Sequence, residues 1–167
     1  VDLMQMALSY LLTIRGIPQI YYGTEVLLEN SAKPGDHGLI RSDFPGGWKE
    51  DGTNGFTGAG LTREQLRIQS FLRKLLNWRK NKTVIHQGNT KHFGPAKGVY
   101  VYFRYNKSET VMVVMNKNTG VTMLDTNRFT EMINGKSQAT DVVSGNTFSF
   151  GNEISVPAKS VLILELK

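Results

Sequence analysis

The residues best suited to chemistry lie in a glycine-rich stretch between positions 26 and 60. Its candidate residues are two carboxylates, an arginine and two aromatic side chains, namely Asp36, Asp43, Arg41, Phe44 and Trp48. Flat aromatic faces stack on sugar rings, while carboxylates and guanidinium groups hydrogen-bond sugar hydroxyls. Long segments without periodicity are often functional. We therefore expect these five residues to contact a carbohydrate. In the alternative, Arg41 pairs with Asp43 and the aromatic rings only hold the loop in place.

Other kinds of chemistry find little support in the sequence. His37, His86 and His92 are far apart and lack metal-ligand spacing, so we expect no metal site and no cofactor. The chain has no cysteine, which excludes disulfides and thiol chemistry. The glycine-rich segment 55–60 precedes a helix but lacks the lysine of a phosphate-binding loop.

Two elements at the N-terminal end would position this loop. Apolar residues at three- and four-residue spacing predict a helix over 3–14, buried on much of its circumference. Residues 17–22 are rich in Ile and Tyr, with Pro18 near the start, and predict a short buried strand. In α/β layers ligands bind beyond the carboxyl ends of strands, which is where Glu25 follows. We favour a structural role for Glu25 over a catalytic one.

A second helix is expected over 62–81, because Thr62 and Gln65 have the spacing of a capping box. Segment 61–107 carries eleven basic residues and one acidic residue. Such a segment could bind nucleic acid, but a solvated helix face is the preferred interpretation, and we expect no nucleic-acid partner.

The remainder predicts an antiparallel β-sandwich. Two strong strands at 98–105 and 109–115 flank an Asn106-Lys107-Ser108 turn, and one helical turn is expected at 128–133. Further strands are expected at 121–124, 139–143, 147–150, 153–156 and 160–166. Alternation places Tyr100 and Tyr102 on one face. If these tyrosines are exposed, they could stack on a glycan or on single-stranded nucleic acid. If the helix that carries Trp78 covers them, the face is a domain interface, and we favour this second interpretation.

The segment 16–25 resembles the eighth barrel strand of the α-amylase family, glycoside hydrolase family thirteen, whose pattern is Gly-Ile-Pro-x-x-Tyr-Tyr-Gly-x-Glu. Segment 40–48 resembles the following loop in neopullulanases and cyclomaltodextrinases. The resemblance continues through 75–80 to 157–162 and so covers nearly the whole chain.

This resemblance implies the end of a TIM-type (β/α)8 barrel over 1–82 and a Greek-key β-sandwich over 83–167. The parent would be a retaining α-glucan hydrolase, neopullulanase- or α-amylase-like, acting on starch-derived oligosaccharides, pullulan or cyclodextrins. The family's catalytic motifs precede the eighth strand, so we expect no catalytic residue here and an inactive fragment. The alternative is a non-catalytic glycan-binding β-sandwich.

The remaining expectations concern location and association. The apolar run 3–14 is too short to span a bilayer, and we expect no membrane partner. The chain begins without Met and within an apolar run, which suggests a piece of a longer protein; the resemblance is compatible with a periplasmic parent. A barrel piece would expose Ile17, Ile20 and the first helix, so we expect the isolated chain to self-associate.

Overall fold

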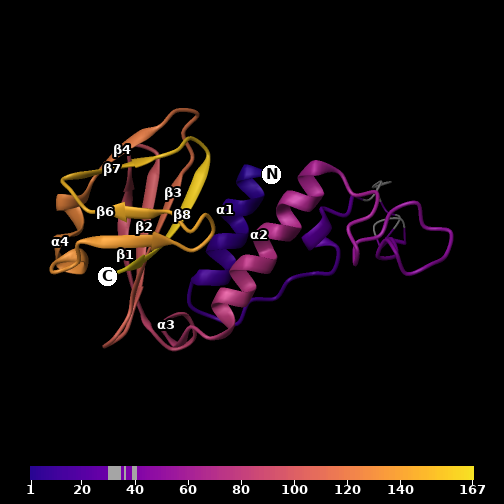
Figure 1. Ribbon diagram of the computed structural model, residues 1–167, viewed down its shortest axis with the longest axis horizontal. Helices are drawn as coiled ribbons and strands as arrows, with labels where there is room; N and C mark the ends of the chain where they lie inside the picture. Colours follow the sequence, from indigo (N-terminus) through magenta and orange to yellow (C-terminus); the bar gives the residue numbers. More distant parts are fainter. Residues whose placement is uncertain (30–34, 36, 39–40) are drawn as a thin grey trace. The chain divides into compact units, whose positions relative to one another are not determined.

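A computed structural model describes residues 1–29, 35, 37–38 and 41–167. These residues form two compact units (Figure 1). One, which we call the β-unit, comprises Val1–Pro18 and Arg73–Lys167; the other, the loop unit, comprises Gln19–Leu72. The domain boundary expected between 82 and 83 stays a prediction. None of the helices in the described part of the chain is long and apolar enough to cross a membrane.

The β-unit is built on an antiparallel sheet of order β1-β2-β3-β8-β5-β6, with a second sheet formed by β4 and β7. The strands are β1 (Asn89–Ala96), β2 (Val99–Tyr105), β3 (Thr110–Asn116), β4 (Thr122–Asp125), β5 (Gln138–Asp141), β6 (Thr147–Ser149), β7 (Glu153–Val156) and β8 (Ser160–Leu166). The expected antiparallel β-domain is therefore confirmed. The helical turn expected at 128–133 is also present, as η2 (Thr126–Phe129) followed by α4 (Thr130–Ile133).

The strand β1 was missed by the sequence analysis. It is a sheet edge, pairs only with β2 among the described strands, and most of its side chains are exposed. It contains Gly94 and Pro95, and its pairing with β2 becomes irregular between Phe93 and Ala96. Proline is confined to edges and bulges because it cannot donate to the ladder. An exposed edge with that composition gives little hydrophobic periodicity to detect.

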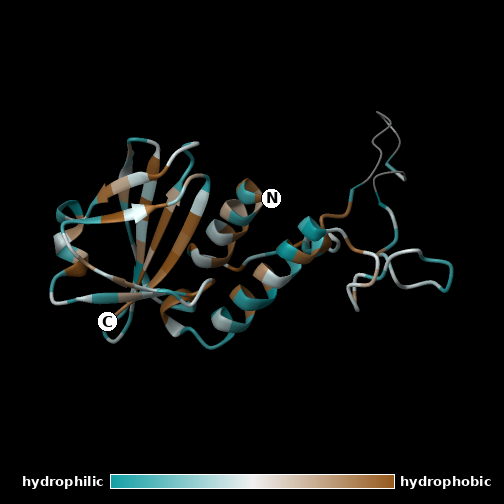
Figure 2. Cartoon of the chain, turned by 45° about the horizontal axis from the view of Figure 1, so that its top comes forward, coloured by the Kyte–Doolittle hydropathy of each residue, from teal (hydrophilic) through white to brown (hydrophobic). Residues whose placement is uncertain are grey.

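The hydrophobic core of the β-unit lies between the two sheets. Strands β2, β3 and β8 contribute alternate residues to it, including Phe103, Met112 and Leu164, and β4 and β7 contribute Leu124 and Ile154. In the view of Figure 2 the central strands of the sheet carry long hydrophobic segments. This pattern arises because both faces of these strands are covered, so their sequences are nearly continuous apolar runs rather than alternating ones.

Helix α1 (Asp2–Thr13) covers the other face of the large sheet (Figure 1). Its Leu8 and Leu12 are buried, and its Tyr10 meets Tyr102 edge to face with ring centroids 5.9 Å apart. The Thr13 and Tyr102 hydroxyls lie 2.5 Å apart in a buried hydrogen bond. The tyrosine face is therefore an internal interface, as favoured from the sequence. The helix that contacts Tyr102 is α1, whereas the helix that carries Trp78 contacts Glu165 of β8.

Tyr102→Phe is expected to cost about 1 kcal/mol in free energy of unfolding, the usual worth of one buried hydrogen bond. Burial raises the pKa of the Tyr102 hydroxyl, although the bond to Thr13 opposes this. Because the pKa of Tyr102 is raised in the folded state, the stabilisation contributed by its neutral hydroxyl is present at neutral pH. This stabilisation is lost as the pH rises past about 10. Urea unfolding between pH 7 and 11 should therefore show a shallower alkaline loss in the variant. An unchanged alkaline slope would contradict this assignment.

Two expectations about the N-terminal segment are wrong. Residues 17–22 form no strand in the structure, and the Ile17 side chain is 99% exposed. A buried parallel strand needs neighbouring strands to satisfy its N–H and C=O groups, and no described strand pairs with this segment. Helix α1 is not buried on much of its circumference, since Leu3, Tyr10 and Leu11 are exposed; this agrees with the separate expectation that a barrel piece exposes its first helix.

Helix α2 (Arg63–Lys80) confirms the second expected helix. Its capping box is formed as predicted: the Thr62 N–H donates to Gln65 Oε1 at 2.8 Å, and the Gln65 N–H donates to Thr62 Oγ1 at 3.3 Å. The last turns of α2 belong to the β-unit. There Trp78 Nε1 donates to Glu165 Oε1 at 2.9 Å, and Arg79 Nε donates to the Leu12 carbonyl at 2.9 Å.

An ionic cluster follows α2. Lys82 Nζ lies 2.5 Å from Glu165 Oε1 and 3.2 Å from Glu109 Oε1. These bonds, first that to Glu165, raise the pKa of Lys82 despite partial burial. Burial raises the pKa of Glu165, but Lys82 and the Trp78 N–H outweigh it and bring the pKa below its ordinary value.

The depressed pKa of Glu165 predicts an acid-sensitive contribution to stability. A carboxylate whose folded pKa is lowered stabilises the protein above its ordinary pKa of 4.5, and the contribution disappears as the pH falls through the folded value. Glu165→Gln should therefore lower the free energy of unfolding at pH 7. As the pH falls below 4.5, the variant should lose less stability than the wild type does. Thermal unfolding from pH 7 to pH 2 measures this, with the exposed Glu131→Gln as the control. Equal losses of thermal stability between pH 4.5 and pH 2 in wild type and Glu165→Gln would refute this prediction.

Candidate functional site

The loop unit holds the described members of the expected carbohydrate site. Arg41, Asp43, Phe44 and Trp48 all lie within Gln19–Leu72, whereas Asp36 lies outside the described residues. The only regular elements among the described residues of this unit are helical: η1 (Thr24–Val26), which contains Glu25, and the first turns of α2. Loop geometry therefore decides how the site residues are presented.

Arg41 and Asp43 are exposed and lie next to a tyrosine pair. The Tyr22 hydroxyl donates to the Ser42 carbonyl at 2.9 Å, and the Tyr21 and Tyr22 rings are 4.7 Å apart. The pKa of Tyr22 is raised, chiefly by a hydrogen bond with Tyr21 and in small part by the charge of Asp43, while Arg41 opposes the shift. No ion pair joins Arg41 to Asp43 among the interactions of the described residues.

Trp48 lies in a turn that is stabilised by hydrogen bonds to the Asp51 carboxylate. Its side chain is 66% exposed. Asp51 Oδ2 accepts hydrogen bonds from the Gly46 N–H at 2.7 Å and from the Trp48 N–H at 3.1 Å. These backbone bonds, led by that from Trp48, lower the pKa of Asp51. The indole is thus exposed on a fixed turn rather than on a free tail.

Phe44 has a different environment. Its ring packs against Gly55, where a Cβ would lie 2.6 Å from the Phe44 Cε1, and its centroid lies 5.0 Å from that of the Phe56 ring, with the two planes tilted by 54°. Asn54 Oδ1 accepts from the Phe56 and Thr57 N–H groups at 2.9 Å each, so a second side chain fixes this turn. Phe56 is 70% exposed.

Phe56 is a candidate contact that the sequence analysis overlooked, because the segment 55–60 was considered only as a phosphate loop and as a flexible lead-in. The available signal was an aromatic residue directly after glycine and ahead of a helix cap. The loop unit exposes the aromatic rings of Trp48 and Phe56 and those of the tyrosine pair Tyr21 and Tyr22, and Arg41 and Asp43 are exposed in the same unit. Such a surface can stack on sugar rings and bind their hydroxyl groups.

The described residues offer no group of three or more His, Asp or Glu side chains arranged to hold a metal ion. His37 and His92 are exposed, and His86 closes the short helix α3 (Thr83–His86) of the β-unit.

Comparison with known proteins defines the class of this chain. Residues 90–165 match the family described as cyclo-malto-dextrinase C-terminal domain. This match covers β2 to β7 and most of β1 and β8, which are the strands of the β-unit. Residues 90–165 are thus similar to this C-terminal domain, and the resemblance to enzymes of the α-amylase family that was seen in the sequence is confirmed.

The curated relatives are cyclomaltodextrin glucanotransferases. That of Geobacillus stearothermophilus is 28% identical over 155 residues, which is 92% of this chain but 19% of the relative. That of Thermoanaerobacterium thermosulfurigenes is 29% identical over 152 residues, which is 91% of this chain and 18% of the relative. The chain therefore spans about a fifth of the length of these relatives.

Solved structures share the fold. A noncanonic maltogenic α-amylase from Thermotoga neapolitana aligns over 98% of this chain and 36% of its own, at 19% identity and a TM-score of 0.68. The α-amylase from Geobacillus thermoleovorans, complexed with acarbose, aligns over 99% of this chain and 33% of its own, at 17% identity and a TM-score of 0.70.

Proposed function

We propose that this chain is the C-terminal part of a retaining enzyme that cleaves α-glucosidic bonds in starch-derived oligosaccharides, pullulan or cyclodextrins, as neopullulanases do. One observation carries the proposal. Relatives named as cyclomaltodextrin glucanotransferases align along 92% of this chain, yet the alignment occupies only 19% of their length. In this proposal residues 1–82 complete a TIM-type barrel and its cleft, and residues 83–167 form the Greek-key domain behind it.

The reaction class has two candidates. Hydrolysis is the one implied by the neopullulanase-like sequence pattern, and transfer to another sugar is favoured by the names of the curated relatives. Retaining glycosidases pass through a glycosyl-enzyme intermediate, and the two reactions differ in whether water or a sugar hydroxyl attacks it. This chain would supply neither the nucleophile nor the acid, so Glu25 and Asp43 would not be catalytic.

The loop unit would supply part of the substrate surface. We assign substrate contacts to Arg41, Asp43 and Trp48, together with Asp36 and Phe44 as expected from the sequence. Phe44 would act mainly by supporting Phe56, because its ring is packed on Gly55. A separate glycan-binding function of the β-unit is less favoured, since Tyr102 is fully buried under α1 and cannot stack on a ligand.

Reducing-sugar release from pullulan and from a cyclodextrin tests the proposal. The purified 167-residue chain should release none, whereas a longer protein that also contains the preceding barrel segments should be active. Cyclodextrin formation from starch by the longer protein would select transfer over hydrolysis. Release by the 167-residue chain that disappears on Glu25→Gln or Asp43→Asn would place the catalytic carboxylates here and sink the proposal.

Trp48→Ala in the longer protein should raise KM for a maltooligosaccharide about tenfold, because one aromatic stacking contact is worth about 1–1.5 kcal/mol. The matched control is Lys49→Ala, which alters the neighbouring exposed side chain. Equal KM values in the two variants would remove Trp48 from the substrate surface.

We also propose that the isolated chain self-associates. Ile17 is 99% exposed, and Leu3, Tyr10 and Leu11 are exposed on α1. Apolar surface of this kind is usually covered by protein. Light scattering over increasing concentration should show species larger than the 18.7 kDa monomer, and Ile17→Lys with Leu3→Lys should reduce them. A wild-type monomer at every concentration would refute this.

A further inference from the structure

A fully buried arginine in the β-unit lacks a negative partner. Arg104 on β2 is 0% exposed. Its Nη2 donates to the Ile85 carbonyl at 2.8 Å, its Nη1 donates to Thr90 Oγ1, and its Nε has no partner. No ion pair with a carboxylate is formed by Arg104 among the described residues. Buried charges are normally paired, because an isolated one costs several kcal/mol of desolvation.

The charges near Arg104 add to the electrostatic cost of burying its guanidinium without a negative partner. Burial lowers the pKa of its guanidinium, and repulsion from Arg15 and Arg79 lowers it further. Arg79 donates its Nε to the Leu12 carbonyl. Arg15 is exposed just after α1, and no hydrogen bond or ion pair of its side chain is found in the described part of the chain. Three cationic groups thus influence one another, and none of them forms an ion pair among the described residues.

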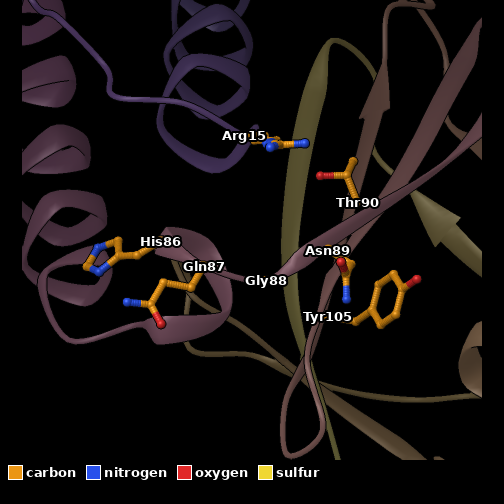
Figure 3. A pocket seen from close by; sticks show the side chains of 7 residues that line it. All are labelled: Arg15, His86, Gln87, Gly88, Asn89, Thr90 and Tyr105. Atoms are coloured by element: carbon orange, nitrogen blue, oxygen red, sulfur yellow. The ribbon is translucent and has the colours of Figure 1, made fainter.

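A pocket opens beside this group. It has a volume of about 440 Å³ and is lined by Arg15, residues 86–90 and Tyr105, none of them acidic. Figure 3 shows the Arg15 side chain extending from the end of α1 toward the strand that carries Thr90, while the His86 side chain points away from both. The Thr90 hydroxyl accepts from Arg104, so its own hydrogen is available to donate into the pocket.

We propose that this pocket binds a small oxyanion group, a phosphate or a carboxylate, held by the Arg15 guanidinium and the Thr90 hydroxyl. Arginine presents a planar fork of donors that matches such groups, and bonds between ionised partners are about twice as strong as neutral ones. The anion supplies the counter-charge that Arg104, Arg79 and Arg15 lack. The two sources of this chemistry, a free phosphate and a carboxylate, differ in geometry and charge, which allows them to be told apart.

Thermal unfolding of the 167-residue chain in three salts tests the proposal. Sodium phosphate and sodium acetate at 20 mM are compared with sodium chloride at equal ionic strength, which removes general screening. For a dissociation constant of about 1 mM, the bound anion should raise Tm by about 4 °C or more. A rise in phosphate alone identifies a phosphate site, and a rise in acetate as well identifies a carboxylate-compatible one. No rise in either overturns the proposal.

Variants locate the effect. Arg15→Gln should abolish the rise in Tm, and Thr90→Val should reduce it. Arg73→Gln is the matched control, since it removes the same charge from an exposed position on α2, outside the pocket, and should retain the full rise. In wild type, phosphate should also shift the backbone amide resonances of Asn89 and Thr90 in an NMR titration. A rise that survives Arg15→Gln, or one lost equally in Arg73→Gln, would reject this pocket as the site.

Discussion

Phe103→Ala is expected to lower the free energy of unfolding of the β-unit by about 4 kcal/mol. Phe103 is fully buried between the sheets. Its ring contacts Phe93 edge to face at 5.7 Å and Phe129 at 6.0 Å, and the Phe93 and Phe129 rings lie 4.9 Å apart. The truncation therefore removes apolar burial, leaves a cavity and breaks a three-ring cluster.

Urea unfolding followed by circular dichroism measures this loss. Met123→Ala is the control, because Met123 belongs to the same unit but is 52% exposed, and its truncation should cost less than about 1 kcal/mol. A cost below about 1 kcal/mol for Phe103→Ala would mean that the aromatic cluster does not support the fold as described.

Asp141→Ala is expected to cost about 3–5 kcal/mol, because Asp141 is a buried carboxylate with several donors. Its Oδ1 accepts from the Ile163 N–H at 2.9 Å, and its Oδ2 accepts from the Ser144 N–H at 2.8 Å and the Ser144 hydroxyl at 2.6 Å. It thereby joins the end of β5 to β8 and closes the turn that leads to β6. Removing it leaves a buried Ile163 N–H without an acceptor.

Asp125→Ala is the matched control for this experiment. Asp125 is exposed and accepts one bond, from the Asn127 N–H at 2.9 Å, as the N-cap of η2. Loss of such a cap costs about 1 kcal/mol. Chemical denaturation of both variants at pH 7 should therefore separate them clearly. If the two substitutions cost the same, Asp141 would not be the joint between β5 and β8.

The candidate site was predictable in composition but not in arrangement. The mixture of charge and aromatic residues at 36–48 is visible in the sequence. The local sequence could not show that Asp51 fixes the turn that carries Trp48. Nor could it show that the Phe44 ring packs against Gly55 while Phe56 is exposed. Those outcomes depend on backbone bonds across the loop. The pocket lined by Arg15 and Thr90 could not be predicted from the sequence either. These two residues, and the Arg104 that donates to Thr90, come from three separate segments.

The sequence by itself determined the antiparallel β-unit, the capped helix α2 and the family. Short apolar runs separated by turn residues, a Thr62–Gln65 capping box and the ordered motifs are signals that lie in neighbouring residues of the sequence. Only the tertiary structure decided the state of residues 17–22 and the cover of the tyrosine face. A strand exists only where a neighbouring strand satisfies its backbone, and none of the described strands pairs with 17–22. Likewise, Tyr102 is buried because α1 packs on its face of the sheet, a long-range contact that alternation within β2 does not encode.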